Sequence, residues 1–160
     1  MTPTQLLLAL LLVPFIAGVL AFAMRWAGPG SKPIATIIHL VSITAVLVLS
    51  IIVIKQVLEL GELRALGEWF RIDSLGAIFL ALVAVVGFLA GLYSVGYMNH
   101  ELRNGEIDLK TLCHYYGFFS IFMSTMVLVV AANNVILMWV AVEATTIASC
   151  LLYTSDAADE

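Results

Sequence analysis

Hydrophobic residues occur along this chain in five long runs, and short polar segments separate the runs. Each run has about twenty residues, the length that an α-helix needs to cross the hydrocarbon core of a bilayer. The pattern therefore predicts an all-α, polytopic membrane protein with five transmembrane helices, over residues 4–24, 33–54, 74–99, 112–132 and 135–152.

The polar segments between the runs predict turns and one short strand. Residues 28–33 read GPGSKP, a composition typical of a turn. In the longest polar segment, residues 68–72 have the pattern of a strand on the membrane surface, with Trp69 and Phe70 at the lipid headgroups. Asp73 follows, where its carboxylate can cap the third helix.

Composition supports the membrane assignment. Of the 160 residues 62% are hydrophobic and only 11% are charged, and the mean hydropathy is +1.09, which excludes an ordinary soluble domain. The net charge of −4 comes largely from acids at the C-terminus, so charge predicts no nucleic-acid partner. Neither Cys113 nor Cys150 belongs to a disulfide or metal pattern, and no nucleotide-binding motif occurs. We therefore expect no cofactor and no metal in this chain, and any electron transfer would take place in other subunits.

Glu143 is the one acidic residue within any of the five runs. A carboxyl group near the middle of a membrane helix costs several kcal/mol, so it is a functional-site hypothesis by default. Trp139 and Thr146 share its helical face, because they lie four residues before it and three after it. The alternative is a structural glutamate that is hydrogen-bonded to a neighbouring helix.

Other polar residues could form an ion pathway together with Glu143. Ser120 and Ser124, one helical turn apart, could face a polar interior beside Glu143, although ordinary hydrogen bonding between helices is the favoured interpretation. Asn133 and Asn134 can end the fourth helix in the left-handed conformation and begin the fifth. The remaining candidates are Thr146, the buried His39, which is more often structural than a relay, and His114, near the membrane surface.

Small residues and basic residues bear on packing and orientation. Gly87, Gly91 and Ser94 form a stripe that predicts close helix packing on the third run. With the N-terminus outside, the inner connections hold four basic residues and the longer outer connection holds three, which weakly favours that orientation.

Two segments carry a resemblance to a known family: YSVGYM at residues 93–98 and NNVILMWVAVEATTIAS at residues 133–149. They resemble the antiporter-like membrane subunits of respiratory complex I, of energy-converting hydrogenases and of multi-subunit Na⁺/H⁺ antiporters. The form MWVAVEATT is most similar to the hydrogenase-type branch. The resemblance covers residues 1–149.

The resemblance implies a subunit of about fourteen helices with two inverted repeats, of which this chain would hold the first five helices. Glu143 matches the family's essential glutamate, whose lysine partner, on the broken seventh helix, would lie beyond this sequence. The implied function is translocation of protons or Na⁺ in an NADH:quinone oxidoreductase-type or hydrogenase-type complex. The implied partners are other membrane subunits and the lipid bilayer, in the cytoplasmic (inner) membrane of a prokaryote.

The last eleven residues, CLLYTSDAADE, resemble the translation of a transposase adapter used in sequencing libraries. We therefore expect residues 150–160 to be a non-native tail without a helical pattern, on a gene that continues with at least nine further spans. A genuine short polar C-terminus is the alternative.

Two other function classes remain open from the sequence. One is a subunit of a multi-subunit Na⁺/H⁺ antiporter without redox chemistry, which only the neighbouring genes would distinguish. The other is a passive membrane anchor, for which replacement of Glu143 by glutamine would have no functional cost.

Overall fold

The computed structural model describes residues 2–26 and 32–157, and five long helices make up most of this part of the chain. The helices are α1 (Pro3–Met24), α2 (Lys32–Leu60), α3 (Ser74–Asn104), α4 (Leu109–Ala131) and α5 (Val135–Ala157), and strands β1 (Glu62–Ala65) and β2 (Phe70–Asp73) join α2 to α3. All five helices are long and apolar enough to cross a membrane. The predicted polytopic membrane fold with five spans is confirmed.

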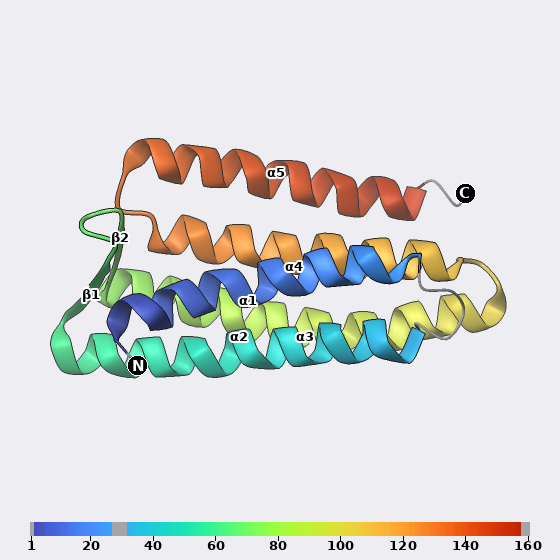
Figure 1. Cartoon of the computed structure of the whole chain (residues 1–160), viewed down its shortest axis with the longest axis horizontal. Coiled ribbons are helices and arrows are strands. Elements are labelled where there is room, and N and C mark those ends of the chain that lie inside the picture. The colour runs from blue at the N-terminus through green and yellow to red at the C-terminus, as the bar shows by residue number, and fades with distance from the viewer. Residues whose placement is uncertain (1, 27–31, 158–160) are drawn as a thin grey trace.

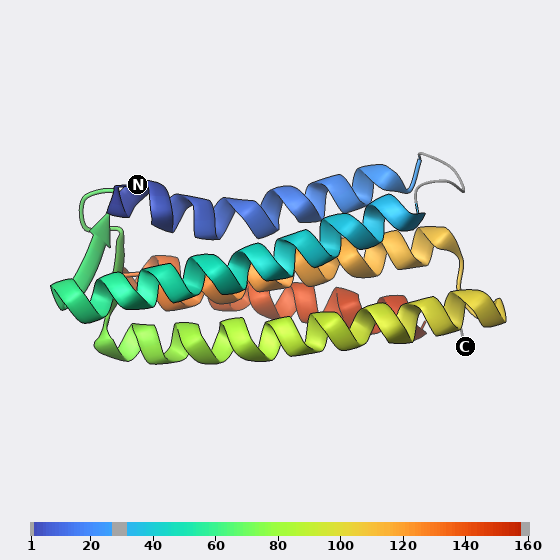
Figure 2. The same cartoon turned by 90° about the horizontal axis from the view of Figure 1, so that it is seen from below.

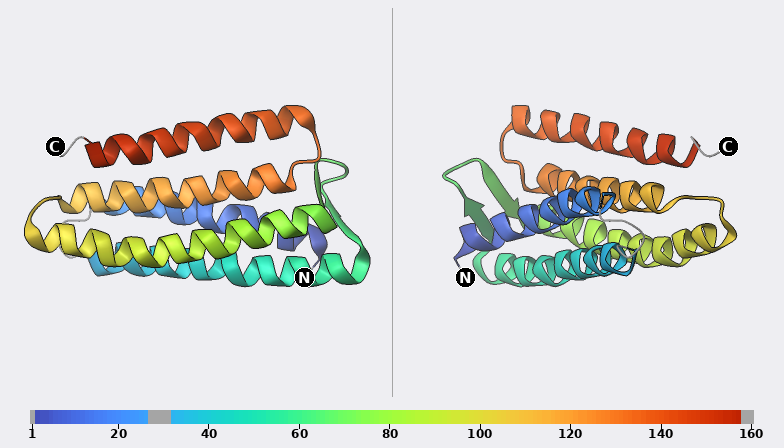
Figure 3. Two further views of the ribbon diagram at one scale, coloured as in Figure 1. Left: turned by 180° about the vertical axis from the view of Figure 1, so that it is seen from behind. Right: turned by 45° about the vertical axis from the view of Figure 1, so that its right-hand side comes forward.

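The first four helices form a bundle, and α5 lies outside it against α4 (Figures 1 and 3). The β-hairpin and the N-terminus lie at one end of the bundle, which we call the hairpin end (Figures 1 and 2). The turn between α3 and α4 and the last turns of α5 lie at the opposite end. Successive helices therefore alternate in direction, as membrane spans joined by short connections must.

Helix ends follow local sequence signals. Thr2 and Gln5 form a capping box at the start of α1. Asp73 caps α3 as predicted, because its carboxylate accepts a hydrogen bond of 2.8 Å from the backbone N–H of Gly76. α3 ends at Asn104, and the next residue, Gly105, has a φ of 78°, in the left-handed region that glycine adopts without strain.

The core of the bundle is mostly apolar, with a few buried polar side chains such as His39 and Ser124, and most of the outer surface is apolar as well. One buried cluster fills the hairpin end and the middle, where Leu10, Val53 and Leu80 are among its members. A second, around Tyr116 and Met98, fills the opposite end. Large hydrophobic side chains also cover the outer faces, as expected of helices that meet lipid or further helices.

The small-residue stripe on α3 lies where helices approach closely, as its spacing predicts. A Cβ atom on Gly91 would lie 2.9 Å from Ile43 Cδ1 and 3.4 Å from His39 Nε2, both on α2. A Cβ atom on Gly87 would collide with the side chain of Met123 on α4. Gly87 and Gly91 therefore let α3 contact two helices at once.

The polar connection between α2 and α3 differs from its prediction in three ways. The expected strand at residues 68–72 is β2, and it pairs with β1, an antiparallel partner that the sequence analysis did not predict. Phe70, which was expected to face the headgroups, is partly buried, because its side chain packs against the core of the bundle. The flanking helices α2 and α3 also extend beyond the predicted spans, since polar residues at their ends continue the helix outside the bilayer.

Two further expectations are wrong. The fourth helix does not end at a left-handed asparagine: α4 ends at Ala131, and Ala132 has an extended conformation. The fifth helix was expected to end at residue 152 and the polar residues after it to lack a helical pattern, but α5 continues to Ala157, because its backbone hydrogen bonds propagate past the last apolar residues. Residues 158–160 lie outside the described part of the chain.

Two glycines on α3 give a matched test of the close packing. Gly91→Ala should lower the unfolding temperature of the detergent-solubilised protein, because overpacking costs about 1–3 kcal/mol. Gly96→Ala is the control, because nothing lies within 4 Å of a Cβ atom there, and alanine favours helix by about 1 kcal/mol. Equal unfolding temperatures for the two variants would refute the close contact.

The topology gives a second prediction. Arg64 in β1 and Asn104 at the end of α3 lie at opposite ends of the bundle. Reporter enzymes fused after these residues should therefore give opposite readings of sidedness, with the Arg64 fusion outside. Identical readings would contradict the five-span arrangement, and opposite readings with Arg64 inside would reverse its orientation.

Candidate functional site

Glu143 lies in the middle of the membrane-spanning part of α5. It follows the first residue of α5, Val135, by about two turns, which places it roughly 12 Å along the helix axis. Half of a bilayer core is about 15 Å thick. In a bilayer centred on this span, the carboxyl group would therefore be far from both headgroup layers.

The face of α5 that carries Glu143 is turned away from the bundle. Ala141 and Ala148 are the buried residues in the part of α5 whose side chains are described, with 0% and 3% of their surface exposed, and they mark the side that packs on α4. Glu143 is about 200° around the helix from Ala141, and it is exposed. Within the described part of the chain, its carboxylate makes no hydrogen bond or ion pair.

Trp139 and Thr146 lie on the same exposed face as Glu143, as their spacing predicts. Trp139 is 64% exposed. The Thr146 hydroxyl donates to the carbonyl oxygen of Val142, 3.1 Å away in the preceding turn. The hydroxyl proton of Thr146 is therefore engaged within α5, but the hydroxyl oxygen can still accept a hydrogen bond from a group on the exposed face.

The two serines of α4 are buried in the four-helix bundle. The Ser124 hydroxyl donates to the backbone oxygen of Leu11 on α1 at 2.9 Å. Ser120 is one turn earlier and is also buried. The Ser124 contact is a hydrogen bond between helices, and it points toward α1 and not toward the Glu143 helix.

Asn133 and Asn134 have different roles at the start of α5. Asn134 caps the helix, because its side-chain oxygen accepts from the N–H of Ile136 at 2.8 Å. Asn133 contacts the hairpin instead. Its side-chain nitrogen donates to the backbone oxygen of Glu68 at 2.8 Å. Its backbone N–H donates to the backbone oxygen of Trp69 at 3.0 Å.

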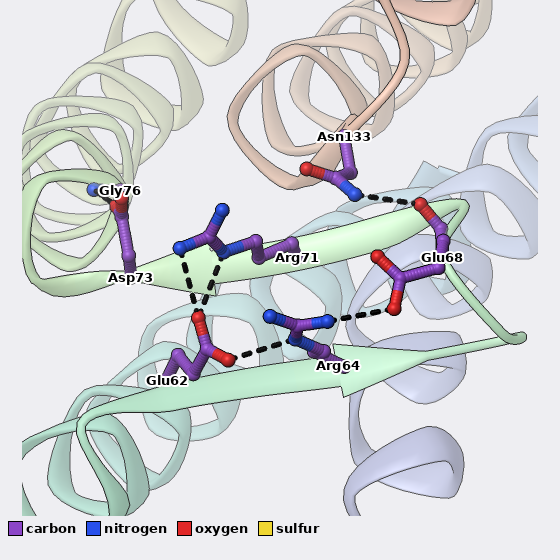
Figure 4. A network of polar contacts seen from close by, with 7 residues as sticks. All are labelled: Glu62, Arg64, Glu68, Arg71, Asp73, Gly76 and Asn133. Carbon is purple, nitrogen blue, oxygen red and sulfur yellow. Dashed lines mark hydrogen bonds and ion pairs between the residues drawn. The ribbon is translucent and has the colours of Figure 1, made fainter.

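The hairpin that receives Asn133 carries a network of charged side chains (Figure 4). Glu62 accepts hydrogen bonds from Arg64 at 2.7 Å and from Arg71 at 2.9 Å. Arg64 also reaches the Glu68 carboxylate at 2.6 Å. The hydrogen bond from Arg64, helped by both positive charges, lowers the pKa of the Glu62 carboxyl.

His39 joins three helices inside the bundle. Its Nε2 lies 3.2 Å from the backbone oxygen of Gly91 on α3, which can only accept, so Nε2 carries the proton and donates. Its ring stacks on that of Tyr116 on α4, with centroids 4.4 Å apart. His39 is fully buried, and this arrangement holds helices together at a distance from the exposed face of α5.

His114 lies at the end opposite the hairpin. Its Nε2 is 2.9 Å from a guanidinium nitrogen of Arg25. A guanidinium group can only donate, so His114 accepts and is neutral in this arrangement. The contact ties the end of α1 to the first turns of α4.

The candidates from the sequence therefore do not form one cluster. The open face of α5 carries Glu143, Trp139 and Thr146. The start of this helix holds Asn133 and Asn134. The other candidates contribute to the packing of the first four helices: Ser120, Ser124, His39 and His114. Among the described residues, no group of three or more His, Cys, Asp or Glu side chains could hold a metal ion.

Comparison with known proteins agrees with this architecture. Residues 67–105, from the hairpin turn through α3, match the family described as NADH-ubiquinone oxidoreductase (complex I), chain 5 N-terminus. The chain is also similar to proteins named as subunits of a hydrogenase, an NADH-quinone oxidoreductase and a Na⁺/H⁺ antiporter.

Three relatives represent the branches of this group. The chain is 31% identical over 86 residues to a hydrogenase-4 component F homolog of Methylacidiphilum infernorum, a match of 54% of this chain and 18% of that protein. It is 34% identical over 82 residues to NADH-quinone oxidoreductase subunit L of Mycobacterium tuberculosis, 51% of this chain and 12% of that protein. It is 35% identical over 81 residues to Na⁺/H⁺ antiporter subunit A1 of Staphylococcus aureus, 51% of this chain and 9% of that protein.

Each match thus covers about half of this chain and less than a fifth of the relative's length.

The lowered pKa of Glu62 predicts a pH dependence of the hairpin contacts. Glu62 is charged in the folded hairpin down to a lower pH than a free glutamate, whose pKa is about 4.3. Its contribution to stability is therefore full above about pH 4.3 and is lost as the pH falls through the lowered pKa. Hydrogen exchange at the Asn133 amide, corrected for intrinsic rates, should accelerate in that range.

Glu62→Gln is the control for this measurement, because glutamine keeps the size of the side chain and does not titrate. The acid-induced acceleration at Asn133 should be smaller in this variant. An equal acceleration in both proteins would assign the effect to other carboxyl groups.

Proposed function

We propose that this chain is the N-terminal part of an ion-translocating membrane subunit, in which Glu143 takes up and releases a proton near the middle of the bilayer. The observation that carries the proposal is the position of Glu143 at mid-span, on the face of α5 turned away from the packed bundle. The names of the relatives support the same class of protein, since they include oxidoreductase, hydrogenase and antiporter subunits.

The physical argument begins from the cost of a carboxyl group in hydrocarbon. A charged carboxylate facing lipid at mid-span is unfavourable by several kcal/mol, so the face needs a cover of protein or water. A basic side chain on that cover would stabilise the charged form, and its withdrawal would favour the protonated form. Alternation between the two arrangements would move a proton over part of the membrane.

The family resemblance indicates which part of the full-length protein would cover the face of α5 that carries Glu143. A lysine on a broken helix later in the full-length protein would face Glu143, and Thr146, whose oxygen can still accept, would lie beside it. The other membrane subunits of the complex and the bilayer are the proposed partners. The proposed location is the cytoplasmic membrane of a prokaryote.

A subunit of a Na⁺/H⁺ antiporter without redox chemistry is the second candidate. The similarity to antiporter subunit A1 favours it about as strongly as the other matches favour an oxidoreductase. Both candidates assign the same role to Glu143. Neighbouring genes for hydrogenase or quinone-reductase subunits, as against small antiporter subunits, would separate them.

Replacement of Glu143 tests the proposal in the full-length protein within its complex. Glu143→Gln should lower proton uptake into membrane vesicles at least roughly tenfold, because glutamine cannot carry a proton and positioned proton-transfer groups contribute about 100-fold or more. Glu143→Asp should keep part of the activity, since it retains the carboxyl group on a shorter side chain.

Glu59→Gln is the matched control, because Glu59 is an exposed acid at the end of α2, outside the predicted spans. It should pump at the wild-type rate. Wild-type pumping by Glu143→Gln would make Glu143 a structural residue, as the passive anchor predicts. Failure of that variant to assemble would also defeat the proposal, since the defect would then lie in folding.

A further inference from the structure

Within the described part of the chain, α4 is the helix that α5 contacts extensively. Ala141 and Ala148 are buried and small, which lets α5 approach α4 closely. The opposite face of α5, which carries Glu143, is open. The depth and rotation of Glu143 therefore depend on one helix contact and on how the start of α5 is held.

Side-chain packing is also sparse around the first turns of α5. A groove of about 490 Å³ lies between α3, α4 and the start of α5, and Phe79, Met126 and Met138 are among its lining residues. Arg71 and Asn133 also line this groove. Within the described part of the chain, α3 therefore does not hold this end of α5 by close packing.

Polar contacts with the hairpin do hold it. The side-chain hydrogen bond from Asn133 to the backbone oxygen of Glu68 joins the connection before α5 to the hairpin turn (Figure 4). A second hydrogen bond, from the backbone N–H of Asn133 to the backbone oxygen of Trp69, joins the same two segments. An antiparallel bridge between Phe70 and Ala132 continues the pairing. Because Asn134 caps α5 directly afterwards, the point at which the helix begins is fixed relative to the hairpin.

The hairpin is itself packed against the first four helices. Leu63, Ala65 and Ile72 are buried in the core of the bundle. On its other side, Arg64 forms ion pairs with both Glu62 and Glu68. Glu68 is therefore held through its carboxylate, while its backbone oxygen accepts the hydrogen bond from Asn133. Asn133 thus connects α5 to a segment that packs on the first four helices.

We propose that Asn133 is a positioning residue for Glu143: by anchoring the start of α5 to the hairpin, it sets the depth and rotation of the carboxyl group. The inference rests on the proposed role of Glu143 in proton transfer. A shift of α5 by one residue would move Glu143 about 1.5 Å along the axis and about 100° around it. Such a change would turn the Glu143 carboxyl group away from the basic side chain that the proposed function places opposite it.

Asn133→Ala in the full-length protein and its complex tests this role. It removes the side-chain hydrogen bond to Glu68 and keeps the backbone one to Trp69. Proton pumping per assembled complex should fall about 3–10-fold, the range expected for one hydrogen bond of about 1 kcal/mol. The pH at half-maximal pumping should shift as well, because a displaced carboxyl group binds its proton with a different affinity.

Asn104→Ala is the matched control. Asn104 is also a hydrogen-bonded asparagine, with Glu106 as a partner, but it lies at the opposite end of the bundle. This variant should keep the wild-type rate and pH dependence.

A disulfide provides the rescue. Antiparallel partners have Cα atoms about 4.5–5.5 Å apart, within the range that a disulfide spans, so Phe70→Cys and Ala132→Cys can be cross-linked. In an Asn133→Ala background, oxidation of this pair should restore the lost pumping and the wild-type pH dependence. The same preparation after reduction is the control.

The outcomes separate the two proposals. If Glu143→Gln stops pumping while Asn133→Ala has the wild-type rate and pH profile, the positioning role is wrong and the proposed function stands. A lower rate with an unchanged pH profile that the disulfide does not restore would make Asn133 a structural residue only. Wild-type pumping by Glu143→Gln would overturn both.

Discussion

Hydrocarbon cannot satisfy hydrogen-bonding groups, and the rest of this structure depends on that constraint. The constraint makes each long apolar segment a helix, because a helix satisfies its backbone internally. It confines the β-hairpin, with its charged side chains, to the polar connection between α2 and α3. It also explains why His39 and Ser124, which lie within spans, bond to backbone oxygens of other helices.

The same constraint makes Glu143 the unusual residue of the chain. His39 and Ser124 are buried by the first four helices, whereas Glu143 is on the open side of α5. A helix that packs through alanines and presents a carboxyl group on its opposite face is suited to a site shared between two groups of helices. The start of α5 is bonded to the hairpin, and the residues of the hairpin are in turn packed against the first four helices.

How much the sequence could predict depends on whether the signal was local. The five spans, the Asp73 cap and the contact at Gly91 follow from composition or spacing over a few residues. Strand β1 has only four residues, and the alternation of Leu63 and Ala65 with charged neighbours becomes a signal only once β2 is known. The contact between Asn133 and Glu68 joins residues 65 positions apart, so no local pattern could reveal it. The side of α5 that packs on α4 likewise depends on the tertiary structure.

The distance in sequence between the hairpin and Asn133 has a consequence for biosynthesis. A ribosome adds about 5–20 residues per second, so roughly 3–13 seconds separate the synthesis of Glu68 from that of Asn133. During this interval α3 and α4 are still being inserted, and the carbonyl groups of the hairpin turn have no strand-like neighbour. Until Asn133 is synthesised, the backbone oxygens of Glu68 and Trp69 therefore lack the partner that they have in the folded chain, and water can take its place. Docking of the connection before α5 displaces that water and completes the pairing at the hairpin turn.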